Sequence, residues 1–559
     1  MRVQPPPAVS AAGPPPAAPP SPRPRRLDRF EIALLVAFGA MSMWTVGLDA
    51  FHAARDGLTW TGTDGYYIVD QMQYLSWVRA AAHHGLIANL FVLRSTPSDY
   101  FQPAILLSGA VAATGVPSWL ALLLWKPVAV VAVFLGMRAA ANRSFAEVAH
   151  RRAALALGVG FGSFTVIAGA LGIVGDMMPT WLSWGYPFGL LSVALITFAV
   201  VRYDRVRLAG RPDWICGLLG GLASMLHPWQ GETLILLVLF AELIRWRDLL
   251  LWWRTAQWRR LALPVLTLAL TALPLLYYLL LGHLDLSWKL ARVQSKHAFP
   301  ASAIAIGIAP LAIPALLGYR GRAQSTLELL LRLWAPVAVL IYVFSATGLS
   351  ATPLHAFDGI TVPLAVLAVK GVTETSLRTI PRAHLVAAGV IALALIPANA
   401  YALATAHKYV DPAGGNANFI THGEHAALHY LDTNPEPGGV LTQFYLGEAV
   451  PGATGRRTFV GNCLWSEPGC FPRSDAADAL FRGQDTQAQA RRLVRQSGAR
   501  FLLASCAAHA DLGRLLGELI VSTTRFGCAT VYELSSPALP RGPLAELPPH
   551  AAVRAPRRQ

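Results

Sequence analysis

The feature that most constrains the fold is a series of apolar segments of about 20 residues separated by short, arginine-rich connections. Each segment approaches the length that a helix needs to cross the hydrocarbon core of a bilayer. Because 54% of the residues are hydrophobic and only 14% are charged, the chain has more apolar surface than a water-soluble core buries. The sequence predicts an all-α polytopic membrane domain with eleven spans, at residues 30–49, 119–138, 153–173, 186–202, 214–228, 230–245, 261–281, 301–318, 327–346, 356–371 and 383–403.

The arginine clusters predict how the chain is oriented in the membrane. The apolar stretch 103–116 is too short to cross, so we expect a re-entrant or interfacial helix there. An odd number of spans then places the N-terminus in the cytoplasm and everything after Tyr401 outside. With this count, the arginine clusters that follow every second span are all cytoplasmic. We therefore attribute the net charge of +15 to membrane topology and expect no nucleic-acid partner.

Composition divides the chain into four parts. Residues 1–28 form a Pro-rich tail that we expect to be disordered and cytoplasmic, and 29–405 form the membrane domain with a long first outer loop at 50–118. Residues 406–535 are turn-rich and predict a small extracytoplasmic α/β domain, and 536–559 predict a second disordered tail. Within 406–535 we expect a helix at Gln487–Ser497 and strands at Gly439–Phe444, Thr458–Gly461, Phe501–Ala504 and Ala529–Leu534.

Four of the five cysteines fall in the predicted extracytoplasmic domain, and Cys216 falls in a membrane span. An even number of cysteines in an oxidising compartment indicates two disulfides. Of the three possible pairings we favour Cys463–Cys470 and Cys506–Cys528. The alternative is that these are buried free thiols, because cysteine is also a common small core residue.

The first outer loop contains a predicted amphipathic helix that begins at Asp70. Leu75 and Val78 share one stripe of this helix, and Asp70 and Tyr74 share another, as in a helix that lies on a membrane surface. Asp70 either caps the helix, since Asp is a preferred N-cap residue, or has a chemical role.

The motif Asp70-Gln71-x-x-Tyr74, followed by Gly85 and by Tyr100-Phe101-Gln102-Pro103, resembles the first loop of GT-C membrane glycosyltransferases. It is most similar to the protein O-mannosyltransferases and lipid A aminoarabinose transferases, whose loop begins Asp-Glu-x-x-Tyr and later reads Lys-Pro-Pro. Gln71 stands in place of the Glu and Gln102 in place of the Lys.

This resemblance, specific over residues 65–130, implies a GT-C-like fold and a polyprenyl-phosphate-sugar donor. The acceptor would be a glycan, lipid or protein outside the cell membrane. Asp70 would be the catalytic acid/base, and Gln71, Tyr74 and Gln102 would contact substrate.

Two further charged residues are candidates for the same site. Lys126 lies inside the second span, where a charge costs about 2.5–3.5 kcal/mol, so we expect it to meet the lipid phosphate or a site carboxylate. The alternative is that Lys126 extends to the interface. Asp176, at the outer end of the third span, is a second catalytic candidate because the resembled enzymes also have an Asp followed by Pro there.

Polar residues at the outer ends of later spans complete the candidate site. We expect His227 and Gln230, in the turn between the fifth and sixth spans, to face a hydrated chamber with His355 and Asp358. An ordinary interfacial Trp turn is the alternative for the first pair. The next outer loop predicts an anion-binding site, or else only solvated charges, from its three cations Lys289, Arg292 and Lys296.

Other motifs provide no further assignment. We find no Gly-rich phosphate loop, zinc-ligand spacing or nucleophile elbow, so we name no metal ligand and leave the need for a divalent cation open. The competing class is a non-catalytic GT-C-like scaffold or accessory protein of envelope assembly. A transporter is disfavoured because the sequence has no evident repeated halves.

Overall fold

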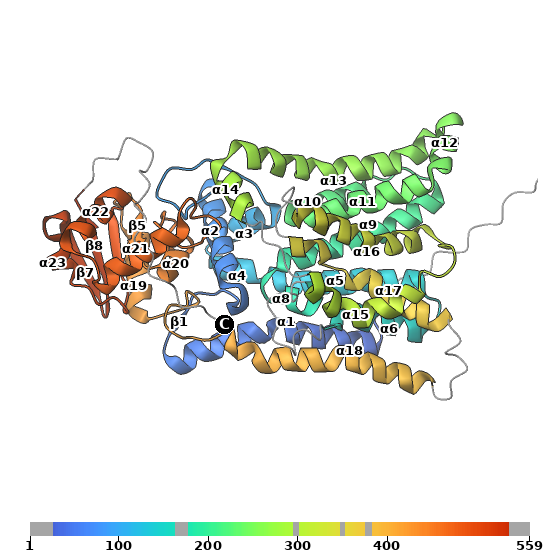
Figure 1. Ribbon diagram of the computed structural model, residues 1–559, viewed down its shortest axis with the longest axis horizontal. Helices are drawn as coiled ribbons and strands as arrows, with labels where there is room; N and C mark the ends of the chain where they lie inside the picture. Colours follow the sequence, from blue (N-terminus) through green and yellow to red (C-terminus); the bar gives the residue numbers. More distant parts are fainter. Residues whose placement is uncertain (1–25, 163–176, 295–300, 347–352, 375–382, 536–559) are drawn as a thin grey trace, which may run out of the picture.

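The computed structural model describes residues 26–162, 177–294, 301–346, 353–374 and 383–535. Long helices fill one end of the molecule, and a β-sheet with shorter helices forms the other, with α2 (Ile68–His84) and α3 (Pro103–Ala113) between them (Figure 1). We call these ends the helical bundle and the sheet end.

Each of the eleven predicted spans contains a helix of the bundle. Seven helical segments are long and apolar enough to cross a membrane, whereas α6, α10, α11 and α15 fall outside that set, so the count of eleven stays a prediction. Residues 163–173 of the third predicted span lie outside the described residues. The helices are α1 (Arg29–Asp56), α4 (Ser118–Leu123), α5 (Trp125–Ser144), α6 (Val148–Gly160), α8 (Pro179–Gly185), α9 (Pro187–Ala209), α10 (Ile215–Leu226), α11 (Pro228–Ile244), α12 (Trp246–Arg254), α13 (Trp258–Leu284), α14 (Leu286–Gln294), α15 (Ala301–Leu317), α16 (Thr326–Ala346), α17 (Thr361–Glu374) and α18 (Ala383–Thr405).

Those arginine-rich connections that the structure describes lie at the end of the bundle away from the sheet (Figure 1). Arg143 donates to Asp204 Oδ2 at 2.8 Å, and the other oxygen of Asp204 accepts from the backbone of Leu327 at 2.9 Å. Arg245 donates to Thr326 at 2.6 Å, which adds the end of α11 to this cluster. Predicted cytoplasmic connections are therefore close neighbours in space, as the positive-inside rule requires of one membrane side.

The stretch 103–116, expected to be re-entrant or interfacial, forms the short helix α3. Its 11 residues are too few to cross a bilayer. α3 packs closely on α2, because a Cβ added at Gly109 would lie 2.6 Å from the Cβ of Ala81.

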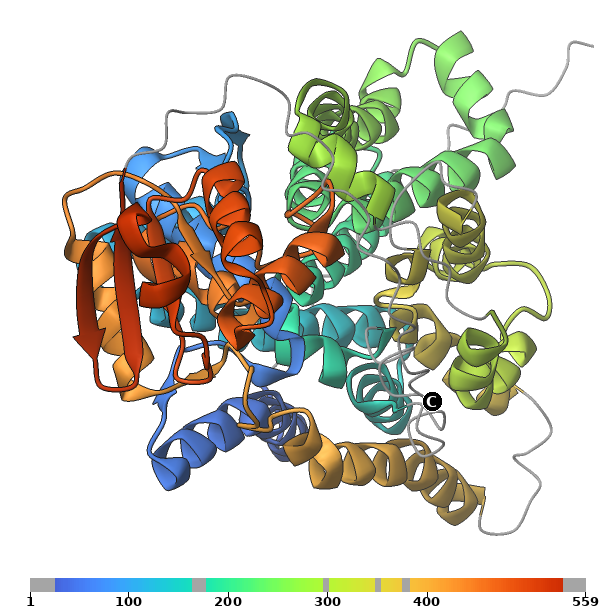
Figure 2. The ribbon, with the colours of Figure 1, turned by 60° about the vertical axis from the view of Figure 1, so that its left-hand side comes forward.

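The sheet end contains a four-stranded mixed sheet in the order β5-β6-β8-β7. β5 and β6 are parallel and the other two pairs are antiparallel. β7 and β8, in red, lie on the side away from the bundle (Figure 2). The strands are β5 (Val440–Thr442), β6 (Phe501–Ala504), β7 (Ile520–Phe526) and β8 (Ala529–Leu534), and the helices are α19 (His422–Thr433), α20 (Phe444–Thr454), α21 (Cys470–Arg482), α22 (Gln487–Ser497) and α23 (Leu512–Leu516).

Sequence prediction of this sheet was accurate in part. The predicted helix and the last two predicted strands match α22, β6 and β8 residue for residue. β5 is shorter than predicted, and the predicted strand Thr458–Gly461 contributes only an isolated bridge between Thr458 and Val440. The edge strand β7 was not predicted.

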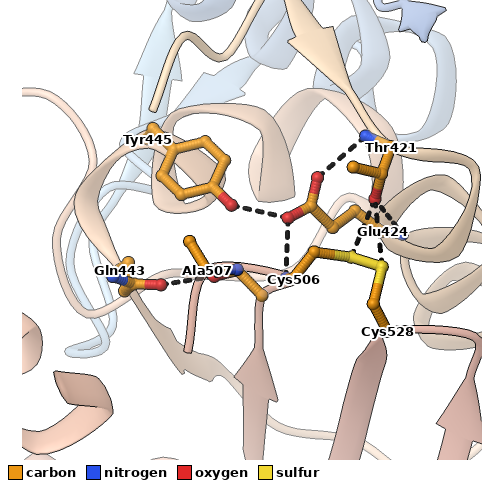
Figure 3. Close-up of a disulfide and its surroundings, with 8 residues drawn as sticks. Thr421, Glu424, Gln443, Tyr445, Cys506, Ala507 and Cys528 are labelled. Atoms are coloured by element: carbon orange, nitrogen blue, oxygen red, sulfur yellow. Dashed lines mark hydrogen bonds between the residues drawn. A yellow bond between two sulfur atoms is a disulfide. The ribbon is translucent and has the colours of Figure 1, made fainter. Parts of the chain in front are cut away.

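Both favoured disulfides are present, so the free-thiol alternative for these four cysteines is wrong. Cys506–Cys528 lies beside the N-terminus of α19, where the Cys506 amide donates to Glu424 at 3.0 Å (Figure 3). The Thr421 hydroxyl lies 3.0 Å from Cys506 Sγ. Cys216 is a buried free thiol in α10.

The first loop and the C-terminal part of the chain share a core. The two-residue strands β1 (Thr59–Trp60) and β4 (Phe419–Ile420) pair antiparallel at its edge, and β2 (Ile87–Ala88) pairs with β3 (Ser98–Tyr100) within the loop. Arg79 of α2 forms an ion pair with Asp432 of α19. One apolar cluster contains residues of the first loop and of the sheet end, among them Met72, Trp77, Ile87, Leu428, Val450 and Phe501.

Candidate functional site

Asp70 lies in the first turn of α2 but does not cap it. The N-cap residue is Tyr67, whose side chain makes no capping hydrogen bond, so the capping alternative for Asp70 is wrong. The Asp70 carboxylate instead accepts a hydrogen bond from the Tyr186 hydroxyl, immediately before α9. The side chain therefore faces the bundle, away from the backbone of its own helix.

The surroundings of Asp70 favour its protonated form. Burial raises the pKa of the Asp70 carboxyl above its ordinary value, and the Tyr186 hydrogen bond and nearby His355 oppose part of this rise. Among the described residues, no Lys or Arg forms an ion pair with Asp70. A carboxylate with a raised pKa is a stronger base than a free Asp, which suits proton abstraction.

Gln71 and Gln102 are both engaged in structural hydrogen bonds. Gln71 is 2% exposed and its amide donates to the backbone oxygen of Gly185. Gln102 caps α3, because its side-chain oxygen accepts from the Ile105 amide at 2.7 Å. Both side chains therefore fix the local backbone.

Tyr74 lies one turn after Asp70 in a group of aromatic rings. Its ring packs edge-to-face against Phe188 of α9, with centroids 5.3 Å apart, and against Trp77 at 5.7 Å. Trp77 in turn contacts Tyr100, and Tyr100 contacts Trp288 of α14. This aromatic layer joins α2 to α14.

Lys126 has a buried carboxylate partner. Its ammonium group forms an ion pair with Asp64, with side-chain exposures of 2% and 1%, and donates to the Trp184 carbonyl at 3.0 Å. The alternative that Lys126 extends to the interface is therefore wrong. Asp64 precedes α2 in the first loop, so the pair fastens this loop to α5.

His227, His355 and Asp358 come together from two distant connections. The His227 Nε2 atom lies 3.8 Å from Asp358 Oδ2, and His355 Nδ1 lies 3.3 Å from the same oxygen. Gln230 fixes the arrangement, since its amide donates to the carbonyls of His355 and Asp358 at 3.3 and 3.4 Å. These three side chains could hold a metal ion, because one ligand atom of each lies within 4.8 Å of the others.

Tyr186 links this cluster to Asp70. Its ring lies edge-on to His355, with centroids 5.9 Å apart, while its hydroxyl donates to Asp70. The structure therefore brings Asp70, His227, Gln230 and His355 into one neighbourhood.

The predicted cationic loop is represented by α14. Lys289 is exposed and Arg292 is half-buried. Both lie on α14, which follows the end of α13 that is nearer to the β-sheet (Figure 1). Trp288 anchors α14 against Trp465, with ring centroids 5.0 Å apart. Lys296, and the second proposed carboxylate Asp176, lie outside the described residues.

The sheet end adds a carboxylate close to Asp70. Glu448 of α20 is 5% exposed, and burial raises its pKa to about 8, with a further contribution from the Asp70 charge. α20 packs tightly on α2, because a Cβ added at Gly452 would lie 3.0 Å from the Leu75 Cβ. Trp465 also donates to the buried Gln73 of α2.

Comparison with known proteins finds similarity at the level of structure. No family model and no curated protein matches the chain. The arabinofuranosyltransferase AftD from Mycobacteria gives a TM-score of 0.52 at 16% identity, over 91% of this chain and 42% of that one. ArnT from Cupriavidus metallidurans, bound to undecaprenyl phosphate, gives 0.50 at 15% identity, over 90% of this chain and 97% of that one. The chain has the GT-C fold.

The archaeal oligosaccharyltransferase AglB from Archaeoglobus fulgidus also matches, with a TM-score of 0.49 at 13% identity, over 85% of this chain and 69% of that one. The GT-C fold describes the arrangement of the helices. At these identities it assigns no role to a side chain.

Within this GT-C fold, sequence reasoning missed Tyr186 and Glu448. Tyr186 lies between two buried helices, and Glu448 lies in a helix far from Asp70 in the sequence. No local motif distinguishes either residue, because each acquires its neighbour only through long-range packing.

Proposed function

We propose that this protein is an integral-membrane glycosyltransferase that moves a sugar from a polyprenyl-phosphate donor to an extracytoplasmic acceptor. The observation that carries the proposal is the Asp70 carboxylate, which Tyr186 holds at the junction of the bundle and the sheet end. The GT-C fold adds support, since AftD is an arabinofuranosyltransferase by its name and ArnT binds undecaprenyl phosphate.

Asp70 acts as the general base in the proposed reaction. Its ionised carboxylate takes the proton from the acceptor hydroxyl or amine while the acceptor lone pair attacks the anomeric carbon of the donor. The bond from that carbon to the phosphate oxygen breaks, and its electron pair stays with the polyprenyl phosphate. A single displacement of this kind inverts the anomeric centre and needs one carboxylate as base.

The donor phosphate is assigned to the cationic segment that contains Lys289, Arg292 and Lys296. Arg is suited to paired hydrogen bonds with phosphate oxygens. α14 meets α2 through the aromatic layer, in which Trp288 contacts Tyr100 and Tyr100 contacts Trp77 of α2, and this supports the assignment. Asp176 is proposed to orient the acceptor. The sheet end would then lie outside the cell and the arginine-rich end in the cytoplasm.

The test is transfer by the purified full chain in nanodiscs, supplied with a panel of undecaprenyl-phosphate-linked sugars and a panel of glycan, lipid and protein acceptors. Asp70→Asn should lower the rate of undecaprenyl phosphate release by about 10²–10⁴-fold and leave the unfolding temperature unchanged. Asp56→Asn is the matched control, because among the described residues the only ion-pair partner of Asp56 is its exposed neighbour Arg55. If Asp70→Asn retains full activity, Asp70 is not the base.

The second candidate is a non-catalytic scaffold of envelope assembly. The observation that favours it is Gln71, whose amide is committed to the Gly185 carbonyl where the resembled enzymes have an acid. A scaffold predicts no release of undecaprenyl phosphate by the wild-type protein, and full complementation by Asp70→Asn in cells that lack the wild-type protein.

A further inference from the structure

Asp358 is a buried carboxylate whose charge is poorly compensated. It is 1% exposed, and among the described residues its only ion-pair partners are His227 and His355. Its Oδ1 atom is buried and has no hydrogen-bond partner there. A buried carboxylate oxygen without a donor is costly, so a positive group at this position would stabilise the ionised form of Asp358.

The hydrogen bonds around Gln230 determine which nitrogen of His227 carries a proton. The Gln230 amide nitrogen donates to two backbone carbonyls, so its oxygen must face His227. His227 Nδ1 therefore carries the proton that is donated to Gln230. In the neutral ring, Nε2 then has a lone pair, and this lone pair faces Asp358 Oδ2.

His355 Nδ1 lies within hydrogen-bond reach of Asp358 Oδ2, at 3.3 Å. Across the gap from His227, two electron-rich atoms, His227 Nε2 and Asp358 Oδ2, face each other at 3.8 Å. Such atoms repel unless a cation lies between them. We propose that His227, His355 and Asp358 bind a divalent transition metal ion of the zinc class. The inference rests on these ligands and is independent of the proposed sugar transfer.

The ligand chemistry selects the type of metal. Two imidazole nitrogens and one carboxylate oxygen suit Zn²⁺ and its neighbours, whereas Mg²⁺ and Ca²⁺ prefer oxygen ligands alone. Three protein ligands leave a fourth position for water or an anionic oxygen. The Gln230 hydrogen bond orients His227 in the way that outer partners orient metal-bound histidines.

The backbone around the site is also fixed. Gly359, directly after Asp358, has φ of +80°, and a Cβ there would lie 2.6 Å from a methyl carbon of Val193. The site lies beside Asp70, because Tyr186 contacts His355 and donates to Asp70.

The test measures metal binding by the purified full chain. After chelation and dialysis, addition of ZnCl₂ should restore about one zinc per chain and raise the unfolding temperature. Asp358→Asn and His355→Ala should each lose this zinc and the temperature rise, and Gln230→Ala should weaken zinc binding about 10–100-fold. Co²⁺ in place of zinc should give visible absorption bands that Asp358→Asn lacks.

Matched controls exclude adventitious zinc. His83→Ala and His425→Ala remove exposed histidines and should leave the zinc content and its stabilising effect unchanged. The proposal is overturned if the wild type binds no zinc, or if Asp358→Asn and His355→Ala retain it. Zinc binding together with absent sugar transfer would refute the proposed function while leaving the metal site intact.

Discussion

The Lys126 ammonium and the Asp64 carboxylate form an ion pair that is almost completely shielded from solvent. Removing one partner leaves the other charge buried, which typically costs about 3–5 kcal/mol. We therefore expect Lys126→Met to lower the unfolding temperature in detergent strongly. The double variant Lys126→Met with Asp64→Asn should recover much of this loss, because no unpaired charge remains. Equal stability of Lys126→Met and wild type would contradict a structural role for the pair.

The hydrogen bond of the Gln71 side chain makes a Glu unfavourable at this position. Its buried amide donates to Gly185, and a carboxylate there would face the carbonyl oxygen with no proton to share. Gln71→Met leaves only the carbonyl unpaired and should lower the free energy of unfolding by about 1–3 kcal/mol. Gln71→Glu should lower it further. The additional loss of stability in Gln71→Glu should disappear at low pH, where the protonated carboxyl becomes a donor. Thermal unfolding of both variants at pH 5 and pH 8 tests this, and an equally stable Gln71→Glu would refute it.

Tyr186 should set the pH at which Asp70 becomes a base. Because the ionised carboxylate is the active form, the transfer rate should rise with pH through the raised pKa of Asp70. The Tyr186 hydrogen bond opposes that raised pKa, so Tyr186→Phe should move the rise to higher pH. The pH profile of kcat/KM measures the shift. Tyr430→Phe, whose ring packs on Phe526 in the sheet end, is the control and should leave the profile unchanged.

Glu448 should make the sheet end less stable as pH rises. Its pKa is about 8 in the folded protein, against an ordinary value of 4.5. The folded state therefore binds this proton more tightly, and the resulting stability is complete below about pH 4.5 and is lost as pH rises towards 8. Each pKa unit of difference corresponds to about 1.4 kcal/mol.

Glu448→Gln should therefore flatten the dependence of the unfolding temperature on pH between 5 and 8. Glu518→Gln, at an exposed position of the same part of the chain, should retain the wild-type slope. A wild-type unfolding temperature that is constant over this range would show that Glu448 ionises normally.

Local sequence signals predicted an element correctly where residues that start and end it are present in the sequence. α22 matches the prediction because Thr486 and Gln489 form a capping box and Gly498 ends the helix in the left-handed conformation. β7 was missed because Ile520–Phe526 lies at the edge of the sheet, where no residue of the strand is fully buried. Its polar Ser-Thr-Thr centre gives a weak strand pattern.

The sequence indicated which residues belong to the candidate site, but not which residues each of them contacts. Asp70 was chosen from its motif, and His227 and His355 from their unusual polarity at membrane depth. Which atoms would meet depended on the packing of helices far apart in the sequence. The contact of Tyr186 with Asp70 and the pairing of Lys126 with Asp64 therefore required coordinates.

The shared core of the first loop and the sheet end has a consequence for biosynthesis. Asn89 donates to the Trp465 carbonyl, a partner that lies 376 positions later in the chain. Ribosomes add about 5–20 residues per second, so the newly made first loop stays without its partner for tens of seconds. During that interval its apolar side chains, including Trp77 and Ile87, lack the surface that later covers them. Translation that stops before residue 406 would therefore yield a chain with a permanently uncovered first loop, a substrate for proteolytic quality control.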